Sequence, residues 1–223
     1  MGVSAENSAV IHADGVAPVI RRIRADEPWR WLEAGWADLR AVPAISLAYG
    51  FVFLSVSLSL AGLLFFSGLS ALLPVFAAGF LLLGPLLAVG LYEASRRLEQ
   101  GAPVRLADVL FVSSRNLTQL ALVGAMLAGA MIVWLQIAGW LFALFFGPIG
   151  IPPLSEFAPL LLLSPRGLAL LVIGTAAGGI IAFAVFAMSA ISVPLLLARD
   201  VDAVTAVLAS VRAVRENFWT MLL

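Results

Sequence analysis

The chain has 223 residues, of which 62% are hydrophobic and only 12% are charged, and its formal net charge is zero. Because soluble proteins carry about 25% charged residues, this composition excludes a soluble globular domain and predicts a polytopic membrane protein. The balanced charge favours neither nucleic acid nor an acidic partner, and the absence of cysteine excludes disulfides, thiolate metal sites and iron–sulfur clusters.

The first segment of the chain, residues 1–28, is polar and is predicted to form a flexible cytoplasmic tail. It has no basic start followed by an apolar core, so it does not read as a cleavable signal peptide. Arg21, Arg22 and Arg24 cluster near its end. Basic residues accumulate on the cytoplasmic side of membrane proteins, which places the N-terminus in the cytoplasm.

The next element is rich in tryptophan, with Trp29, Trp31 and Trp36 in eight residues. Trp29 and Trp36 share one helical face with two leucines at the spacing i, i+3, i+7 and i+10, which predicts an amphipathic helix over 29–41. Because indoles prefer the headgroup level of a bilayer, we expect this helix to lie flat on the membrane surface. The alternative is a tryptophan-rich helix buried in protein.

Four apolar segments follow that are long enough to cross a bilayer, since a crossing needs about 20 residues. Gly84-Pro85 predicts a kink in the second segment, and Gly147-Pro148 ends the third. We expect an all-α membrane domain over 29–223, in which four transmembrane helices form two hairpins. Their predicted ranges are about 42–66, 72–92, 117–146 and 168–197.

The connections between these segments differ in charge. All thirteen basic residues are arginine, and Arg166 is the one that falls on the predicted outer side. This asymmetry predicts a multi-pass protein of the bacterial inner membrane. The outer connection over 147–166 is unusually apolar, so we expect it to dip back to the membrane surface or to be covered by another chain.

The end of the chain repeats the pattern of its beginning. An apolar stripe at the same spacing, Val201, Val204, Leu208 and Val211, predicts a second amphipathic helix over 201–216. The segment 105–116 occupies the corresponding place before the third span. The chain therefore reads as a cytoplasmic surface helix followed by a membrane hairpin, used twice and begun a third time, with the start of a fifth span after residue 217.

Two strings of residues resemble a known family. The residues that carry the resemblance are Trp31, Gly35, Trp36, Asp38, Leu39, Pro43, Ser46, Leu47, Tyr49 and Gly50, joined by Gly84, Pro85, Gly90, Leu91, Tyr92, Glu93, Ser95, Arg96 and Gly101. Together they resemble the proteobacterial integral-membrane family known as domain of unknown function 2189. The resemblance implies a further membrane hairpin beyond Leu223, and it implies no catalytic, cofactor-binding or metal-binding residue.

The polar residues give little sign of chemistry. The single histidine, His12, lies in the tail, and the four predicted spans contain no Asp, Glu or Arg, whereas haem sites and proton relays need such groups at depth. We expect no enzyme and no cofactor. Glu93, followed by Arg96 and Arg97, predicts an ion pair at the membrane interface. Gln136 is the best candidate for a hydrogen bond between helices.

Small residues spaced by four are the clearest indication of helix packing, because they let helices approach closely. They serve packing within the chain or against a partner, and the sequence does not divide them between these roles. The pairs are Gly84 and Ala88, Gly124 and Ala128, Ala125 and Gly129, and Gly174 and Gly178.

These features favour a non-catalytic inner-membrane protein that acts as an accessory or assembly subunit of a larger complex, such as a respiratory or photosynthetic one. The expected partners are the lipid bilayer and other membrane subunits or further copies of the chain, with no nucleic acid. The alternative is a small transporter or channel that uses the kinked second span and the region of Gln136. A membrane enzyme is the third and least favoured reading.

Overall fold

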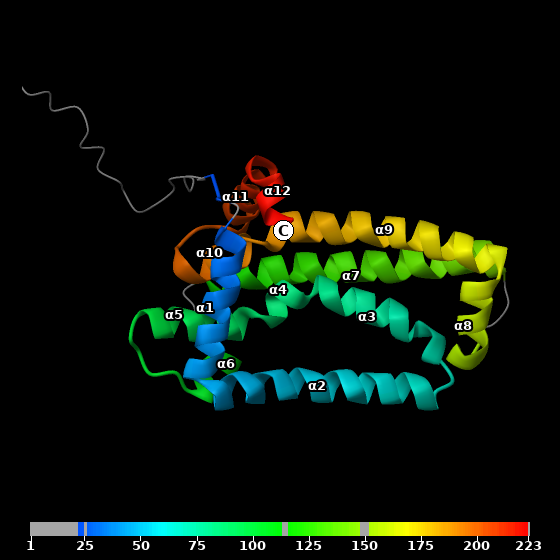
Figure 1. Cartoon of the computed structure of the whole chain (residues 1–223), viewed down its shortest axis with the longest axis horizontal. Coiled ribbons are helices and arrows are strands. Elements are labelled where there is room, and N and C mark those ends of the chain that lie inside the picture. Colours follow the sequence, from blue (N-terminus) through cyan, green and yellow to red (C-terminus); the bar gives the residue numbers. More distant parts are fainter. Residues whose placement is uncertain (1–21, 25, 113–115, 148–151, 223) are drawn as a thin grey trace, which may run out of the picture.

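The computed structural model describes residues 22–24, 26–112, 116–147 and 152–222, and within these ranges the regular structure is entirely helical (Figure 1). The prediction of a flexible tail falls mostly on residues 1–21 and 25, which lie outside the described residues. The helices of the first half are α1 Glu27–Ala41, α2 Pro43–Phe66, η1 Ser70–Leu72, α3 Leu73–Leu82, α4 Gly84–Leu87, α5 Val89–Glu99 and α6 Leu106–Leu110. Those of the second half are α7 Leu117–Phe146, α8 Leu154–Leu163, α9 Pro165–Ser189, α10 Ser192–Ala198, α11 Ala203–Glu216 and α12 Phe218–Met221.

Three of the helical stretches in the described residues are long and apolar enough to cross a membrane, namely Pro43–Phe66, Leu117–Phe146 and Pro165–Ala198. The first two match the predicted spans 42–66 and 117–146 closely. The third comprises α9 and α10 and begins three residues before the predicted 168–197. It starts earlier because Pro165 is tolerated in the first helical turn, and Ser164 caps that turn by accepting a hydrogen bond from Gly167 N at 3.0 Å.

The second predicted span, 72–92, is not a continuous helix, and the count of four spans is therefore not confirmed. It is divided into α3, α4 and α5, with breaks at Leu83 and Ala88. The first break lies at the predicted kink, because Pro85 has no N–H to donate to the carbonyl of Leu81. At this point the helix makes a tighter turn, in which Leu83 N donates to the carbonyl three residues earlier, Phe80 O, at 3.1 Å.

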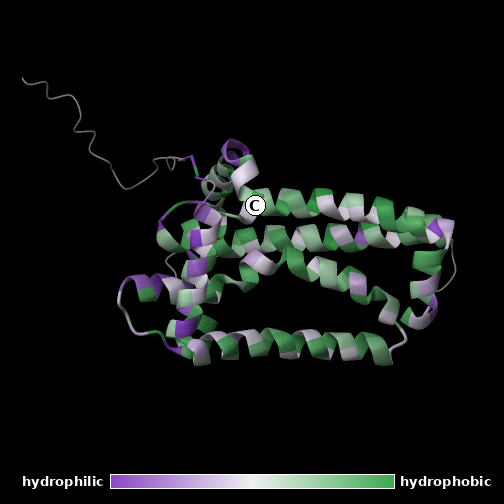
Figure 2. Cartoon of the chain, in the orientation of Figure 1, coloured by the Kyte–Doolittle hydropathy of each residue, from purple (hydrophilic) through white to green (hydrophobic). Residues whose placement is uncertain are grey.

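The helices run back and forth between the two ends of an elongated molecule (Figure 1). The helix α2 leads from α1 to η1, and α3, α4 and α5 return toward α1. The helix α7 runs out again, α8 lies across the far end, and α9 returns. Figure 2 shows that the long helices are hydrophobic along their length and that hydrophilic residues gather at the end formed by α1, α5, α6 and α11.

The main core lies between α3, α7 and α9 to α11, and α7 packs on both α3 and α9. It is built from aliphatic side chains and a single tryptophan, and its members include Leu82, Leu120, Val123, Leu127, Trp134, Val185, Val193, Leu196 and Ala206. The helix α2 stands apart from this core. Its buried residues are Tyr49 and Leu64, near its two ends, and the residues between them are partly or fully exposed.

The apolar connection over 147–166 contains the helix α8. Residues 148–151, and with them Pro148 of the predicted Gly147-Pro148 stop, lie outside the described residues. Phe157 of α8 is buried against the end of α7, with its ring centroid 5.8 Å from that of Phe142 and 6.1 Å from that of Phe146. This connection is therefore folded onto the end of the bundle.

The two stretches predicted as amphipathic helices are helical, with shifted starts. The helix α1 begins at Glu27 rather than Trp29, since Pro28 fits its first turn. The helix α11 begins at Ala203, capped by the Asp202 carboxylate, which accepts a hydrogen bond from Thr205 N at 2.9 Å. Within the segment 105–116, the described helix is the short α6.

The predicted apolar stripe of α11 is not the face that packs on the bundle. Val204 and Leu208 are exposed, while the buried face carries Ala206, Ala209 and Ser210. Small side chains allow α11 to approach α9 and α10 closely, whereas Val204 and Leu208 point away from the bundle.

Candidate functional site

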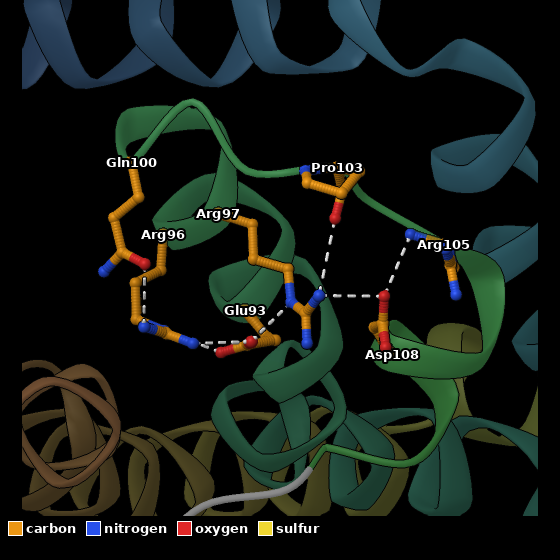
Figure 3. A network of polar contacts seen from close by, with 7 residues as sticks. All are labelled: Glu93, Arg96, Arg97, Gln100, Pro103, Arg105 and Asp108. Atoms are coloured by element: carbon orange, nitrogen blue, oxygen red, sulfur yellow. Dashed lines mark hydrogen bonds and ion pairs between the residues drawn. The ribbon is translucent and has the colours of Figure 1, made fainter.

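Polar side chains meet at the end of the bundle where α1, α2, α5 and α6 come together, and their centre is Glu93 (Figure 3). The Glu93 side chain is only 4% exposed. The guanidinium of Arg96 donates to both of its carboxylate oxygens, from Nε to Oε2 at 2.8 Å and from Nη2 to Oε1 at 2.7 Å. Arg97 Nε donates to Oε1 at 2.8 Å. Because α5 places residues three and four apart on one face, the predicted ion pair is present.

A second carboxylate extends this network from α5 to α6. Arg97 Nη1 donates to Asp108 Oδ2 at 2.9 Å. The same oxygen accepts a hydrogen bond from Arg105 N at 3.2 Å, across the start of α6. Arg97 therefore bridges two carboxylates, and the short helix α6 is fixed to α5 by charge-assisted hydrogen bonds (Figure 3).

A tyrosine connects α2 to the break between α4 and α5. The Tyr49 hydroxyl donates to Leu87 O at 2.8 Å and accepts a hydrogen bond from Gly90 N at 3.3 Å. Gly90 N is one of the first N–H groups of α5, which have no partner inside their own helix. A Cβ on Gly90 would lie 2.4 Å from Val109 O and 2.6 Å from the Tyr49 ring, so this close approach requires glycine.

The helix α1 is attached to the same place. Ser95 Oγ of α5 donates to the Asp38 carboxylate of α1. Contacts from α1, α2 and α6 therefore converge on α5, and we call the set Asp38, Tyr49, Gly90, Glu93, Ser95, Arg96, Arg97 and Asp108 the α5 cluster. Most of these residues belong to the two strings that carried the family resemblance, so the structure brings the two strings together.

The electrostatics of the α5 cluster favour a structural role, in which ion pairs hold the helices together, over a catalytic one. The hydrogen bonds from Arg96, followed by those from Arg97, lower the pKa of Glu93 below its ordinary value, although burial opposes this shift. The carboxylate is thus held ionised and its oxygens are occupied by guanidinium groups, which leaves it poorly placed to accept a proton from a substrate. In the described part of the chain, no group of three His, Cys, Asp or Glu side chains is placed to hold a metal ion.

The tryptophans of α1 are exposed rather than buried in the chain. Trp29 is 68% exposed, Trp36 is 56% exposed, and Trp31 is exposed as well. No residue of α1 is buried. The Arg40 guanidinium lies over the Trp36 ring, 5.5 Å from its centroid. The indoles are therefore free to contact a bilayer or another protein.

The structure divides the small-residue positions between two environments. Gly124 faces Leu86, since an added Cβ would lie 3.2 Å from that side chain, and Gly178 faces Trp134 at 2.9 Å. These two positions serve packing within the chain. The other glycines of the pairs spaced by four are Gly84, Gly129 and Gly174, and an added Cβ on any of them would meet nothing within 4 Å. Ala88, the partner of Gly84, is partly buried, whereas Ala125, the partner of Gly129, and Ala128, the partner of Gly124, are exposed.

The two features of the transporter alternative are not brought together. Trp134 points toward α3, the first part of the interrupted segment 72–92, and donates from Nε1 to Val75 O at 2.9 Å. Gln136 follows two residues later, about 200° around the helix, and its side chain is exposed. Gln136 therefore lies on the face of α7 that points away from the kinked segment.

Other polar groups satisfy backbone atoms where helices are interrupted. Ser210 Oγ donates to Ala187 O at 2.8 Å and accepts from Ile191 N at 3.1 Å, at the break between α9 and α10. Gln119 Oε1 accepts from Ala203 N at 2.8 Å at the start of α11. Ser55, Ser189 and Ser192 bond the carbonyl four residues earlier in their own helix. These contacts stabilise the fold and form no convergent site.

The contacts that sequence reasoning missed are long-range ones, namely Tyr49 with Gly90, Asp38 with Ser95, and Arg97 with Asp108. The available signal was the resemblance itself, which contained Asp38, Tyr49, Gly90 and Ser95 without pairing them.

A comparison with known families gives a match over the core of the chain. The family described as predicted integral membrane protein (DUF2189) matches residues 72–198, which is more than half of the chain. The matched region begins in η1 and ends at the last residue of α10, so it contains α5 with Glu93 and Arg96 as well as the core helices α7 and α9. No match was found among curated proteins or among solved structures.

Proposed function

The chain belongs to this family of integral membrane proteins, and from that premise we propose that it is a non-catalytic accessory or assembly subunit. In this role it packs its helices against those of a larger complex of the bacterial inner membrane. Neither the α5 cluster nor the polar groups at the helix breaks present a site for a reacting molecule. What the chain offers instead is exposed helical surface.

The observation that carries the proposal is the isolation of α2. Its contacts with the rest of the chain are concentrated at its ends, with α1 and α6 at one and with η1 at the other. Phe51, Leu54 and Leu58, in its middle, are all exposed. The helix is apolar all round, as expected of a helix surrounded by lipid or by other helices. Docking of a partner helix against α2 would cover this surface on sides that the chain leaves open.

The amphipathic helices support a second contact of the same kind. The tryptophan face of α1 and the Val204 and Leu208 face of α11 are exposed at the end of the bundle where arginines gather. Tryptophan and large aliphatic side chains on a surface helix suit both the lipid interface and a docked protein. We therefore assign these faces to positioning the chain at the cytoplasmic surface of its complex.

The proposal also includes the path of the chain through the membrane. We infer that α3, α4 and the beginning of α5 together make a second crossing, so that four crossings place α1, α5, α6 and α11 on the cytoplasmic side. All described arginines except Arg166 lie on or beside these helices, in accord with the positive-inside rule.

The test is site-specific photocrosslinking in native membranes. A photoreactive residue is placed at Leu54 or Leu58 of α2, and at the buried core position Leu127 as a control. We expect adducts with one defined foreign protein from the α2 positions and none from Leu127. Native mass spectrometry after extraction in mild detergent should then show the same protein bound. The accessory role would be refuted by two results together. Photocrosslinking would give adducts with lipid alone, and native mass spectrometry would give only the mass of the chain and its multiples.

A further inference from the structure

The amide of Gln136 faces outward from α7 and belongs to neither the core nor the α5 cluster. Within the part of the chain that the structure describes, the Gln136 side chain is exposed and makes no hydrogen bond. At a rise of 1.5 Å per residue it lies about 15 Å from the end of α7 at Phe146. It is the one Asn, Gln or ionisable residue between Leu120 and Phe146.

An exposed amide is costly at this depth in a membrane. Transfer of an amide from water to a hydrocarbon that offers no hydrogen bond costs several kcal/mol, and the bilayer core contains no water to compensate for it. Ser189 and Ser192 solve the same problem by bonding carbonyls of their own helix, whereas Gln136 does not. Its amide therefore requires a partner from outside the described chain.

The helix face around Gln136 allows another helix to approach closely. On a helix with 3.6 residues per turn, Ala125, Gly129 and Ala143 lie within about 20° of Gln136 around the axis. An added Cβ on Gly129 would meet nothing within 4 Å, and Ala125 and Ala143 are exposed. Trp140, on the same side, is 77% exposed. Small residues flanking a polar residue are typical of packed transmembrane helices.

We propose that the partner is a second copy of this chain, which packs its α7 in parallel against the first so that the two Gln136 side chains bond each other. Copies inserted with the same topology place Gln136 at the same depth. The amide has both a carbonyl acceptor and NH₂ donors, so a twofold axis beside Gln136 lets each side chain donate to the other. A foreign helix would instead need a matching polar group at this one depth.

Dimerisation through α7 is independent of the accessory role. The dimer uses the outward face of α7, whereas the accessory role uses α2, and among the described residues α2 and α7 are not one of the main packed pairs of helices. A dimer through α7 would leave α2 free to bind a foreign subunit. A mass of two copies supports the inference, and a mass that includes another protein supports the accessory role.

The absence of cysteine makes disulfide crosslinking a clean test. Single cysteines are placed at Ile132 and at Ala143 on the Gln136 face, and at Leu58 on α2 as an exposed control. In oxidised native membranes we expect disulfide-linked dimers from Ile132→Cys and Ala143→Cys, and few from Leu58→Cys. Equal crosslinking at all three positions, or none on α7, would overturn the interface.

The role of the amide is tested by Gln136→Leu and by Gln136→Asn, which keeps a shorter amide. Subunit counting by single-molecule photobleaching in liposomes, at increasing dilution in lipid, measures the dimerisation constant. We expect Gln136→Leu to dimerise about tenfold more weakly and Gln136→Asn to retain part of the affinity. Leucine is a good helix former and is apolar, so unchanged thermal unfolding serves as the check on folding. Wild-type affinity in Gln136→Leu would contradict the proposal.

Discussion

The indole of Trp134 occupies the space that Gly178 leaves open by lacking a side chain. A Cβ at position 178 would lie 2.9 Å from Trp134 Cζ3 and 3.1 Å from Cη2. The same indole donates from Nε1 to Val75 O of α3 at 2.9 Å, and an added Cβ on Gly79 would lie 3.4 Å from its Cδ1. One tryptophan of α7 thus packs between α3 and α9, and two glycines make the room for it.

This relationship predicts that Gly178→Val destabilises the fold. The added side chain must displace a buried indole that is fixed by a hydrogen bond, and overpacking of this kind costs about 1–3 kcal/mol. Gly179→Val is the matched control, since a Cβ on Gly179 meets nothing within 4 Å. Thermal unfolding in detergent, followed by tryptophan fluorescence, should show a lower midpoint for Gly178→Val alone. Equal midpoints for the two variants would show that α7 and α9 do not pack in this way.

The second prediction concerns the contact between Tyr49 and Gly90. Tyr49→Phe removes a hydroxyl that bonds two backbone groups at the break between α4 and α5, so we expect a loss of about 1 kcal/mol in stability. The chain offers Tyr92→Phe as a control, because no hydrogen bond from the Tyr92 hydroxyl is found among the described residues. Thermal unfolding of both variants in the same detergent measures the difference, and an equal effect of the two substitutions would speak against the bridging role.

The third prediction is that Glu93→Gln weakens the attachment of α5 to α6. The neutral amide cannot accept the paired guanidinium bonds as strongly as a carboxylate, and because the two arginines stay partly hydrated we expect a loss of about 2 kcal/mol. Glu99→Gln, at an exposed position of the same helix, should be neutral. Hydrogen exchange should show faster amide exchange in α6 for Glu93→Gln. Unchanged protection of α6 would mean that the α5 cluster is not what fixes it.

The same residue predicts how stability depends on pH. The pKa of Glu93 is lower in the folded chain than its ordinary value, chiefly because Arg96 bonds the carboxylate. The unfolded chain therefore binds the proton at higher pH than the folded chain, so the stabilisation is complete above the unfolded pKa, near 4.3, and is lost as pH falls through the folded one. Between pH 7 and pH 3 the wild type should lose its stability advantage over Glu93→Gln. A constant difference across this range would contradict the assignment.

Local patterns in the sequence were sufficient to predict the helices whose character is uniform along their length. The range predicted for α7 is the one observed, because thirty residues without proline or charge permit only a long apolar helix. The interruption at Gly84-Pro85 was also predicted, since the loss of one N–H is a local property. The periodicity did not predict that 72–92 is divided into three helices. The second break, at Ala88, has no proline or other local feature that would mark it in the sequence.

The contacts between helices were beyond the sequence for a different reason. Spacing by four marks Gly124, Gly129, Gly174 and Gly178 alike, yet Gly124 and Gly178 receive a side chain from a neighbouring helix and Gly129 and Gly174 do not. That difference depends on how each helix is rotated about its axis, which is fixed by contacts between residues distant in the sequence. For the same reason, the pairing of Asp38 with Ser95 emerged only once α1 and α5 were placed together.

The last prediction tests the second crossing directly. If α3, α4 and the start of α5 cross the membrane, then Ser67 and Glu99, both exposed, lie on opposite sides of it. With the arginine-rich end in the cytoplasm, a membrane-impermeant maleimide should label Ser67→Cys in intact cells and Glu99→Cys only after permeabilisation. A cysteine at the exposed Leu163, in α8 between α7 and α9, should behave like Ser67→Cys. If Glu99→Cys is labelled in intact cells together with Ser67→Cys, the broken segment returns to the side it came from, and the protein has three crossings instead of four.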